Sequence, residues 1–152
     1  WDVSLLMESA LQVYYLVMAV YGWWQWQHGN GGQRELAISR WGSRQHLVAL
    51  AAVLACTLAS GALLQHYTGA ALPYLDSFTT WGSILTTWMV ARKILENWLY
   101  WLLIDSVSIY LYLDRELYLT AALFVAYLVI VIFGYRQWSQ HYQQQHCPAP
   151  SN

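Results

Sequence analysis

The stretch LVALAAVLACTLASGALL, residues 47–64, contains no charged side chain. A transmembrane helix needs about 20 consecutive apolar residues, so this stretch and its two neighbours predict a membrane-spanning helix over residues 46–65. The rest of the chain has the same character, because 58% of its 152 residues are hydrophobic and 10% are charged. A soluble domain carries about 25% charged residues. The sequence therefore predicts an all-α, polytopic transmembrane protein.

The charged residues gather in short clusters, and long apolar stretches lie between them. This pattern predicts a single transmembrane domain over residues 1–138 and a polar C-terminal tail over residues 139–152. The tail is rich in Gln and ends in CPAPSN, a composition typical of a disordered segment. The chain starts in apolar sequence without Met, so we expect that Trp1 is not the natural start. The five expected helices cover residues 5–27, 46–65, 72–91, 94–113 and 117–138.

Basic residues predict the orientation of these helices, because Lys and Arg near the ends of membrane spans are retained in the cytoplasm. Six of the seven basic residues fall in the links after the first and third helices and at the end of the fifth. The seventh, Arg115, lies between two acidic residues. We therefore expect the first helix to enter from outside and the C-terminus to be cytoplasmic.

The first and fifth expected helices share a pattern at an offset of 112 residues. YGWWQW at 21–26 aligns with FGYRQW at 133–138, and Gly, Gln and Trp are identical in register. Either chance similarity between two aromatic-ended helices or an internal duplication explains this pattern. A duplication would be a parallel repeat, a known construction of transporters. The last three helices would then form one unit, 46–65 would be a linker, and two helices before the first would be missing from this chain.

One face of the fourth expected helix is unusually polar. Asp105 falls near its middle, where a carboxylate costs about 2.5–3.5 kcal/mol on insertion scales. Asn97, Trp101, Asp105 and Ser108 recur at helical spacing and therefore share a face that could line a polar cavity. Alternatively, Asp105 forms a hydrogen bond with a Ser or Thr of a neighbouring helix, and Trp98 and Trp101 belong to the aromatic belt at the membrane interface.

Further candidate binding residues lie on the first and third expected helices. On the first, Trp23, Trp26, Tyr15 and Gln12 share a face, although the Trp residues could equally belong to the aromatic belt. On the third, Thr87 belongs to a stripe of small hydroxyl residues. Such a stripe can line a cavity, but it is also typical of close helix packing.

The sequence offers little for catalysis. No His falls in the middle of an expected helix, and we find no HExxH motif, no Gly-rich phosphate loop and no nucleophile–base pair at a useful spacing. Cys56 and Cys147 fit neither a disulfide framework nor a zinc site. The longest basic run is Arg92-Lys93, which does not suit nucleic acid. We therefore expect no enzyme activity, no catalytic residue, no metal, no cofactor and no nucleic-acid partner.

Two segments together resemble the PnuC family of nicotinamide riboside transporters: YGWWQW at 21–26, and WMVARKILENWLYWLLIDSVSIYLYL at 88–113. The resemblance covers about residues 5–138. It implies seven helices in two parallel three-helix units joined by a linker helix, a SWEET-like arrangement of which this chain would supply the last five. It also implies facilitated diffusion of nicotinamide riboside across the bacterial inner membrane by a homotrimer, with an intracellular kinase trapping the product.

The resemblance also implies roles for individual residues. It places the tryptophan motif of the family on Trp23 and Trp26, and the Asn/Trp motif on Asn97, Trp98 and Trp101. A cationic pyridinium over an indole gains about 0.5–2 kcal/mol, and amide side chains can pair with the carboxamide of the vitamin. The expected substrate-binding residues are Gln12, Tyr15, Trp23, Trp26, Thr87, Asn97, Trp98, Trp101 and Asp105.

Three alternatives stay open at this point. The substrate could be another aromatic vitamin such as thiamine, which is also a cation. The chain could be a membrane-embedded enzyme acting on a lipid or quinone, which would require a clustered acid/base or metal site. It could also be a non-transport membrane subunit, whose polar residues would pair with one another and leave no cavity.

Overall fold

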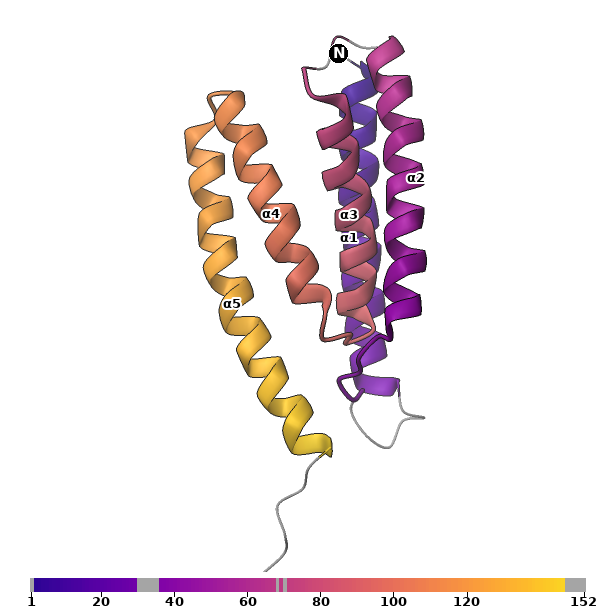
Figure 1. The fold of residues 1–152 in the computed structure, drawn as a ribbon, viewed down its shortest axis with the longest axis vertical. Coiled ribbons are helices and arrows are strands. Elements are labelled where there is room, and N and C mark those ends of the chain that lie inside the picture. The colour runs from indigo at the N-terminus through magenta and orange to yellow at the C-terminus, as the bar shows by residue number, and fades with distance from the viewer. Residues whose placement is uncertain (1, 30–35, 68, 70, 147–152) are drawn as a thin grey trace, which may run out of the picture.

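The computed structural model describes residues 2–29, 36–67, 69 and 71–146, and the side chains from residue 11 onward within them. Five α-helices make up most of this part of the chain (Figure 1). Each lies where the sequence predicts a helix, although several boundaries differ. The helices are α1 (Asp2–His28), α2 (Ser43–Tyr67), α3 (Pro73–Ala91), α4 (Asn97–Asp114) and α5 (Tyr118–His146).

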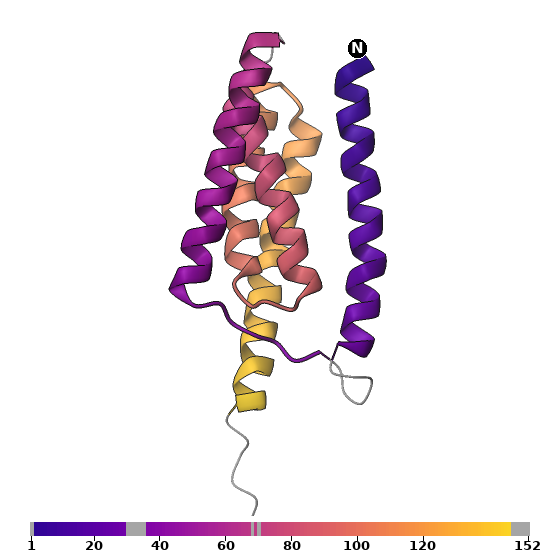
Figure 2. The same cartoon turned by 90° about the vertical axis from the view of Figure 1, so that its right-hand side faces the viewer.

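Successive helices run in opposite directions, so α1 and α5 point the same way (Figure 1). Helix α3 lies at the centre of the arrangement and packs against α1, α2 and α4, while α5 packs against α4. Figure 2 shows α1 at one side of the bundle, beyond α3. The relative direction of the first and last helices is therefore the one that a parallel repeat requires.

Large apolar side chains are exposed on all five helices, as expected for surfaces that face lipid. Leu16 of α1 is 67% exposed, Leu47 of α2 70% and Leu119 of α5 88%. Within the described residues, α2 and α5 are long and apolar enough to cross a membrane by length and composition. The other three helices do not reach this criterion, because Trp, Tyr and small polar residues replace many of their aliphatic side chains.

The fourth helix begins at Asn97, three residues later than the expected start at residue 94. Lys93 has a positive φ of 50°, which interrupts the helical path between α3 and α4. The residues that follow pair with the link between α1 and α2: the Ser39 N–H donates to the Lys93 carbonyl at 3.0 Å, and the Leu95 N–H donates to the Ser39 carbonyl at 2.9 Å. Backbone pairing with a distant segment has thus replaced the first turn of the expected helix.

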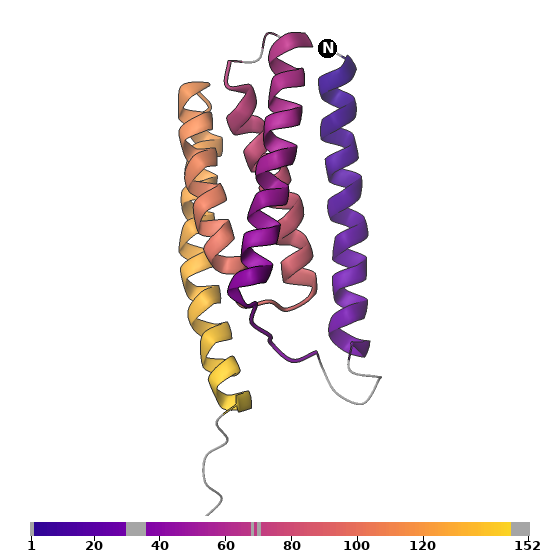
Figure 3. The ribbon, with the colours of Figure 1, turned by 45° about the vertical axis from the view of Figure 1, so that its right-hand side comes forward.

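Residues 36–42 cross one end of the bundle between α1 and α2 (Figure 3). Buried Glu96 anchors this segment: its carboxylate accepts a hydrogen bond from Arg40 Nε at 2.9 Å and another from the Trp41 N–H at 3.2 Å. The same carboxylate raises the pKa of the Arg40 guanidinium. We call this the basic end of the bundle, because it carries Arg40, Arg92 and Lys93.

The fifth helix does not end at Trp138 but continues to His146, so the expected polar tail is helical as far as His146. Gln is a good helix former, and tertiary contacts hold the added turns. The Ile38 N–H donates to Gln145 Oε1 at 3.2 Å, and the Arg40 guanidinium lies 5.8 Å from the centre of the Tyr142 ring. The remaining part of the expected tail, residues 147–152, lies outside the described residues.

Candidate substrate cavity

A cavity of about 690 Å³ lies between α1, α3, α4 and α5. Six aromatic rings, several hydroxyl groups, one amide and two carboxylates line it, together with aliphatic side chains. Helices α3 and α4 supply both carboxylates and the Ser and Thr hydroxyl groups. The lining residues are Leu11, Gln12, Tyr15, Asp76, Thr79, Thr80, Ser83, Trp98, Trp101, Asp105, Ser108, Tyr112, Leu123, Phe124, Tyr127, Ile130 and Val131.

The polar face expected on α4 borders this cavity for most of its length. Trp101, Asp105 and Ser108 line the cavity as their helical spacing predicts, and Tyr112 continues the same face by one further turn. Trp98 lines it as well. In a non-transport membrane subunit, the polar residues were expected to pair with one another and leave no cavity. The position of these side chains on a cavity argues against that alternative.

Asp105 is the most unusual group in the cavity wall. It is only 3% exposed, and it forms no hydrogen bond or ion pair with any described residue, so the expected alternative of a Ser or Thr partner is not observed. Burying a carboxylate without a partner is costly. Because Asp105 carries this energetic cost and its side chain lies on a cavity, it is a candidate ligand-binding residue.

Asp76 is the second carboxylate of the cavity, and its charge is compensated. Arg115, at the end of α4, donates from one guanidinium nitrogen to both carboxylate oxygens at 2.7 and 2.5 Å. This ion pair lies at the opposite end of the bundle from Lys93. No Lys or Arg is among the residues that line the cavity, so the uncompensated charge of the site is that of Asp105.

Asn97 lines neither this cavity nor the smaller one described below. It is fully buried as the first residue of α4, and its Nδ2 donates to the Ile94 carbonyl at 2.6 Å. Its Oδ1 is also buried and has no hydrogen-bond partner among the described residues. The side chain turns back toward the preceding turn because the helix starts there, which helical spacing alone does not reveal.

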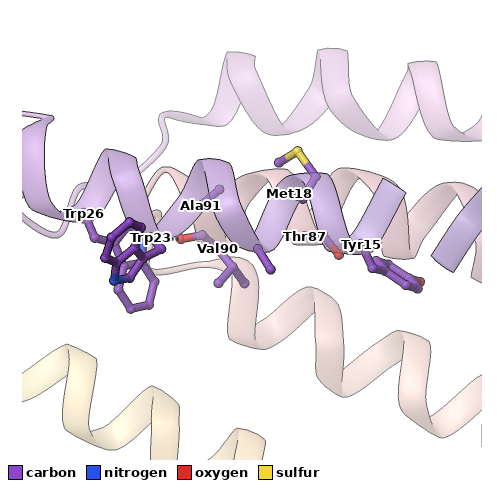
Figure 4. A pocket seen from close by; sticks show the side chains of 9 residues that line it. Tyr15, Met18, Trp23, Trp26, Thr87, Val90 and Ala91 are labelled. Carbon is purple, nitrogen blue, oxygen red and sulfur yellow. Dashed lines mark hydrogen bonds between the residues drawn. The ribbon is translucent and has the colours of Figure 1, made fainter. Parts of the chain in front are cut away.

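A smaller and mostly apolar cavity of about 320 Å³ lies between α1 and α3. Trp23, Trp26 and Thr87 line this smaller cavity, although we expected them beside the other candidate binding residues. Tyr15 borders both cavities. In Figure 4, Trp23 and Trp26 lie together at one end, with Thr87 and Met18 nearer to Tyr15. The structure therefore divides the expected binding residues other than Asn97 between two sites.

The two Trp residues of the smaller cavity have features of an interfacial belt. Trp23 is 64% exposed. The Trp26 Nε1 donates to the Val90 carbonyl at 3.2 Å, and Lys93 Nζ lies 5.0 Å from the centre of its ring. Because its donor and one ring face are occupied by neighbouring groups, Trp26 has less to offer a ligand than Trp98 or Trp101.

Three Trp side chains from three helices meet near the basic end. Trp138 lies edge-on to Trp98, with ring centres 5.4 Å apart at 90°, and contacts Trp26 at 5.9 Å and 66°. The Trp98 Nε1 is buried and has no hydrogen-bond partner among the described residues. Trp26 and Trp138 are the residues that correspond at the 112-residue offset.

Helix α5 contributes cavity residues that the sequence did not single out. Phe124 and Tyr127 line the cavity, and Phe124 also packs against Tyr112 at 5.1 Å. Nothing in their local sequence distinguishes them from lipid-facing aromatics. Thr80 and Ser83 had a signal, since they belong to the hydroxyl stripe of α3, and the structure places them on the larger cavity.

A bundle of helices with apolar outer surfaces around an aromatic, acidic cavity defines a class of protein: a multi-pass membrane transporter for a small molecule. A family model described as nicotinamide mononucleotide transporter matches residues 1–140. The chain belongs to this family, which includes PnuC. It is a family of vitamin transporters and not of enzymes.

Two transporters are similar to this chain in sequence. The riboflavin/roseoflavin transporter RibM of Streptomyces davaonensis is 30% identical over 136 residues, which are 86% of this chain and 63% of RibM. The nicotinamide riboside transporter PnuC of Escherichia coli K12 is 22% identical over 91% of this chain and 68% of its own length.

The crystal structure of the vitamin B3 transporter PnuC has a TM-score of 0.68 to this chain at 23% identity, covering 86% of this chain and 60% of that one. This likeness confirms the helical fold. The chain spans less than two thirds of RibM and of the solved PnuC chain.

Proposed function

We propose that this chain belongs to a passive transporter that takes up nicotinamide riboside. The observation that carries the proposal is the composition of the larger cavity: aromatic rings, hydroxyl groups and one uncompensated carboxylate, without a basic side chain. Its volume of about 690 Å³ lies within the range of about 300–1,000 Å³ that is usual for small-molecule sites.

The three parts of nicotinamide riboside each have a partner in this cavity. Trp98 and Trp101 offer indole faces to the cationic pyridinium, an attraction of about 0.5–2 kcal/mol. Asp105 complements the positive charge of the ring. Gln12 can pair with the carboxamide, and the Ser108 hydroxyl with the ribose. Asn97 is not part of this proposal, because it lies outside the cavity.

The charge of the cavity favours the nucleoside over the mononucleotide. A phosphate group adds a charge of about −1.5 to −2 at neutral pH. Within the cavity it would meet the uncompensated charge of Asp105 and no basic lining residue. A phosphorylated vitamin is therefore a poor substrate for this site, and phosphorylation inside the cell would prevent the product from returning.

Riboflavin is a second candidate, because RibM is the relative with 30% identity. Its ring system and ribityl chain would also find aromatic and hydroxyl partners in the cavity. Riboflavin is neutral, so it gains nothing from the charge of Asp105. Thiamine, a cation, shares the charge argument but lacks a ribose to engage the hydroxyl groups.

The remaining parts of the proposal concern assembly and orientation. We propose a homotrimer in the bacterial inner membrane, in which each complete chain has seven helices in a SWEET-like parallel repeat and this segment supplies the last five. The parallel direction of α1 and α5 supports the repeat. The gathering of Arg40, Arg92 and Lys93 at one end of the bundle supports a cytoplasmic location for that end and for the C-terminus.

Uptake into liposomes tests the proposed function. Full-length protein is reconstituted without ATP or an ion gradient, and entry of labelled nicotinamide riboside, riboflavin and thiamine is measured in parallel. The proposal expects nicotinamide riboside to equilibrate across the membrane. Uptake of riboflavin alone would keep the mechanism and change the vitamin, while no uptake of any of the three by folded protein would overturn the proposal.

A further inference from the structure

Gly134 of α5 lies directly beneath the indole ring of Trp98. A Cβ atom at position 134 would lie 2.5 Å from Trp98 Cζ3 and 2.6 Å from Cζ2, and closer still to Cη2. Carbon atoms in contact are about 3.5–4.0 Å apart, so any side chain here would displace the ring. Glycine is therefore the one residue that allows Trp98 to lie as deep against α5 as it does.

Trp138 closes a second side of the same ring. It lies one helical turn beyond Gly134 on α5 and meets Trp98 edge-on, with ring centres 5.4 Å apart at 90°. Trp138 is in turn held by Trp26 of α1 at 5.9 Å. Gly134 and Trp138 thus form a notch on α5 that holds the Trp98 ring, and Trp98 also lines the larger cavity.

From this geometry we infer that Gly134 is a positioning residue for substrate binding: it sets how far the Trp98 ring projects into the cavity. The inference rests on the proposed function, in which Trp98 stacks on the vitamin ring. A methyl group at position 134 would push the indole out of the notch, and because Trp138 blocks movement along α5, the ring would enter the cavity. There it would occupy substrate space and lose its alignment for stacking.

Gly134→Ala in the full-length protein tests this inference, with nicotinamide riboside and riboflavin as titrants in calorimetry. Loss of a well-aligned aromatic contact corresponds to about a tenfold rise in Kd. Gly61→Ala is a matched control. A Cβ there would lie 2.9 Å from Cε1 and 3.0 Å from Cγ of Tyr74, so the crowding is similar. Gly61 belongs to α2 and Tyr74 to α3, and neither residue lines the cavity. This control should lose thermal stability without a change in Kd.

A second variant shows whether the effect passes through Trp98. Phenylalanine at position 98 lacks the outer indole atoms that a Cβ at position 134 would meet. In a Trp98→Phe background, Gly134→Ala should therefore cause no further change in affinity, a non-additive result expected of residues in contact. If Gly134→Ala alone does not fold, recovery of folding in the double variant supports the contact, and failure of the double variant to fold overturns the inference.

A readout without ligand separates this inference from the proposed function. Fluorine NMR of protein labelled with 5-fluorotryptophan gives a Trp98 signal, identified by its loss in Trp98→Phe. Gly134→Ala should shift this signal, and Gly61→Ala should not. An unchanged Trp98 signal overturns the inference whether or not the wild type binds a vitamin, and so does a Kd that rises equally in both Gly→Ala variants.

Discussion

Replacing Asp105 with Asn should have opposite effects on stability and on binding. Asp105 is only 3% exposed as a whole residue, and its carboxylate has no hydrogen-bond or ion-pair partner among the described residues. Asn keeps the shape but removes the charge, and with it the cost of burying an unpaired ion. We therefore expect Asp105→Asn to unfold at a temperature equal to or above that of the wild type.

Asp105→Asn should weaken the binding of a cation, because Asp105 has no protein partner that compensates its charge. Two unit charges about 6 Å apart interact by about 2.8 kcal/mol at an effective dielectric constant of about 20. A loss of that size raises Kd about a hundredfold. Nicotinamide riboside, which is cationic, should lose this affinity, whereas neutral riboflavin should bind about as well as before.

The assay is isothermal titration of purified full-length protein, paired with a thermal unfolding curve for each variant. Asp114→Asn is the matched control, because it removes the same charge from an exposed position outside the cavity lining. The reasoning is refuted if Asp105→Asn binds nicotinamide riboside as tightly as the wild type does. It is also refuted if the two Asp→Asn variants weaken binding equally.

Three further predictions concern residues around the site. Glu96→Ala should lower the free energy of unfolding by about 1 kcal/mol, because the Trp41 N–H loses its acceptor, and Glu96→Gln should recover part of the loss in chemical denaturation. Trp24→Phe should leave Kd unchanged in calorimetry, because Trp24 is 53% exposed and lines neither cavity; a collapse of binding would contradict this. Asp76→Asn should change the melting temperature little, because its ion pair with Arg115 is partly exposed, and a large loss would show that this pair holds α3 and α4 together.

Helical spacing predicted which side chains share a face wherever a helix continues through the site. It predicted that Trp101, Asp105 and Ser108 share the cavity face of α4. It was wrong for Asn97, because the helix begins at that residue and the side chain turns back to the Ile94 carbonyl. The late start itself depends on backbone pairing with Ser39, which lies far away in the sequence.

Other differences have the same origin in contacts between distant segments. The extension of α5 to His146 is fixed by Gln145 and Tyr142 against the link between α1 and α2, and composition alone favoured disorder there. Trp23 shares a face with Tyr15, as expected, but near Trp23 that face borders a separate cavity, because the backbone of α1 packs closely against α3. The position of Phe124 on the cavity could not be predicted from the sequence, because an aromatic residue that faces lipid has the same kind of local sequence.

The most direct test of the account is a comparison of two titrants that differ by one phosphate group. Nicotinamide riboside and nicotinamide mononucleotide are titrated separately into the same preparation of full-length protein. A cavity with Asp105 uncompensated and no basic lining residue predicts binding of the riboside and no measurable binding of the mononucleotide. Equal or tighter binding of the mononucleotide would contradict the assignment of this cavity as the substrate site.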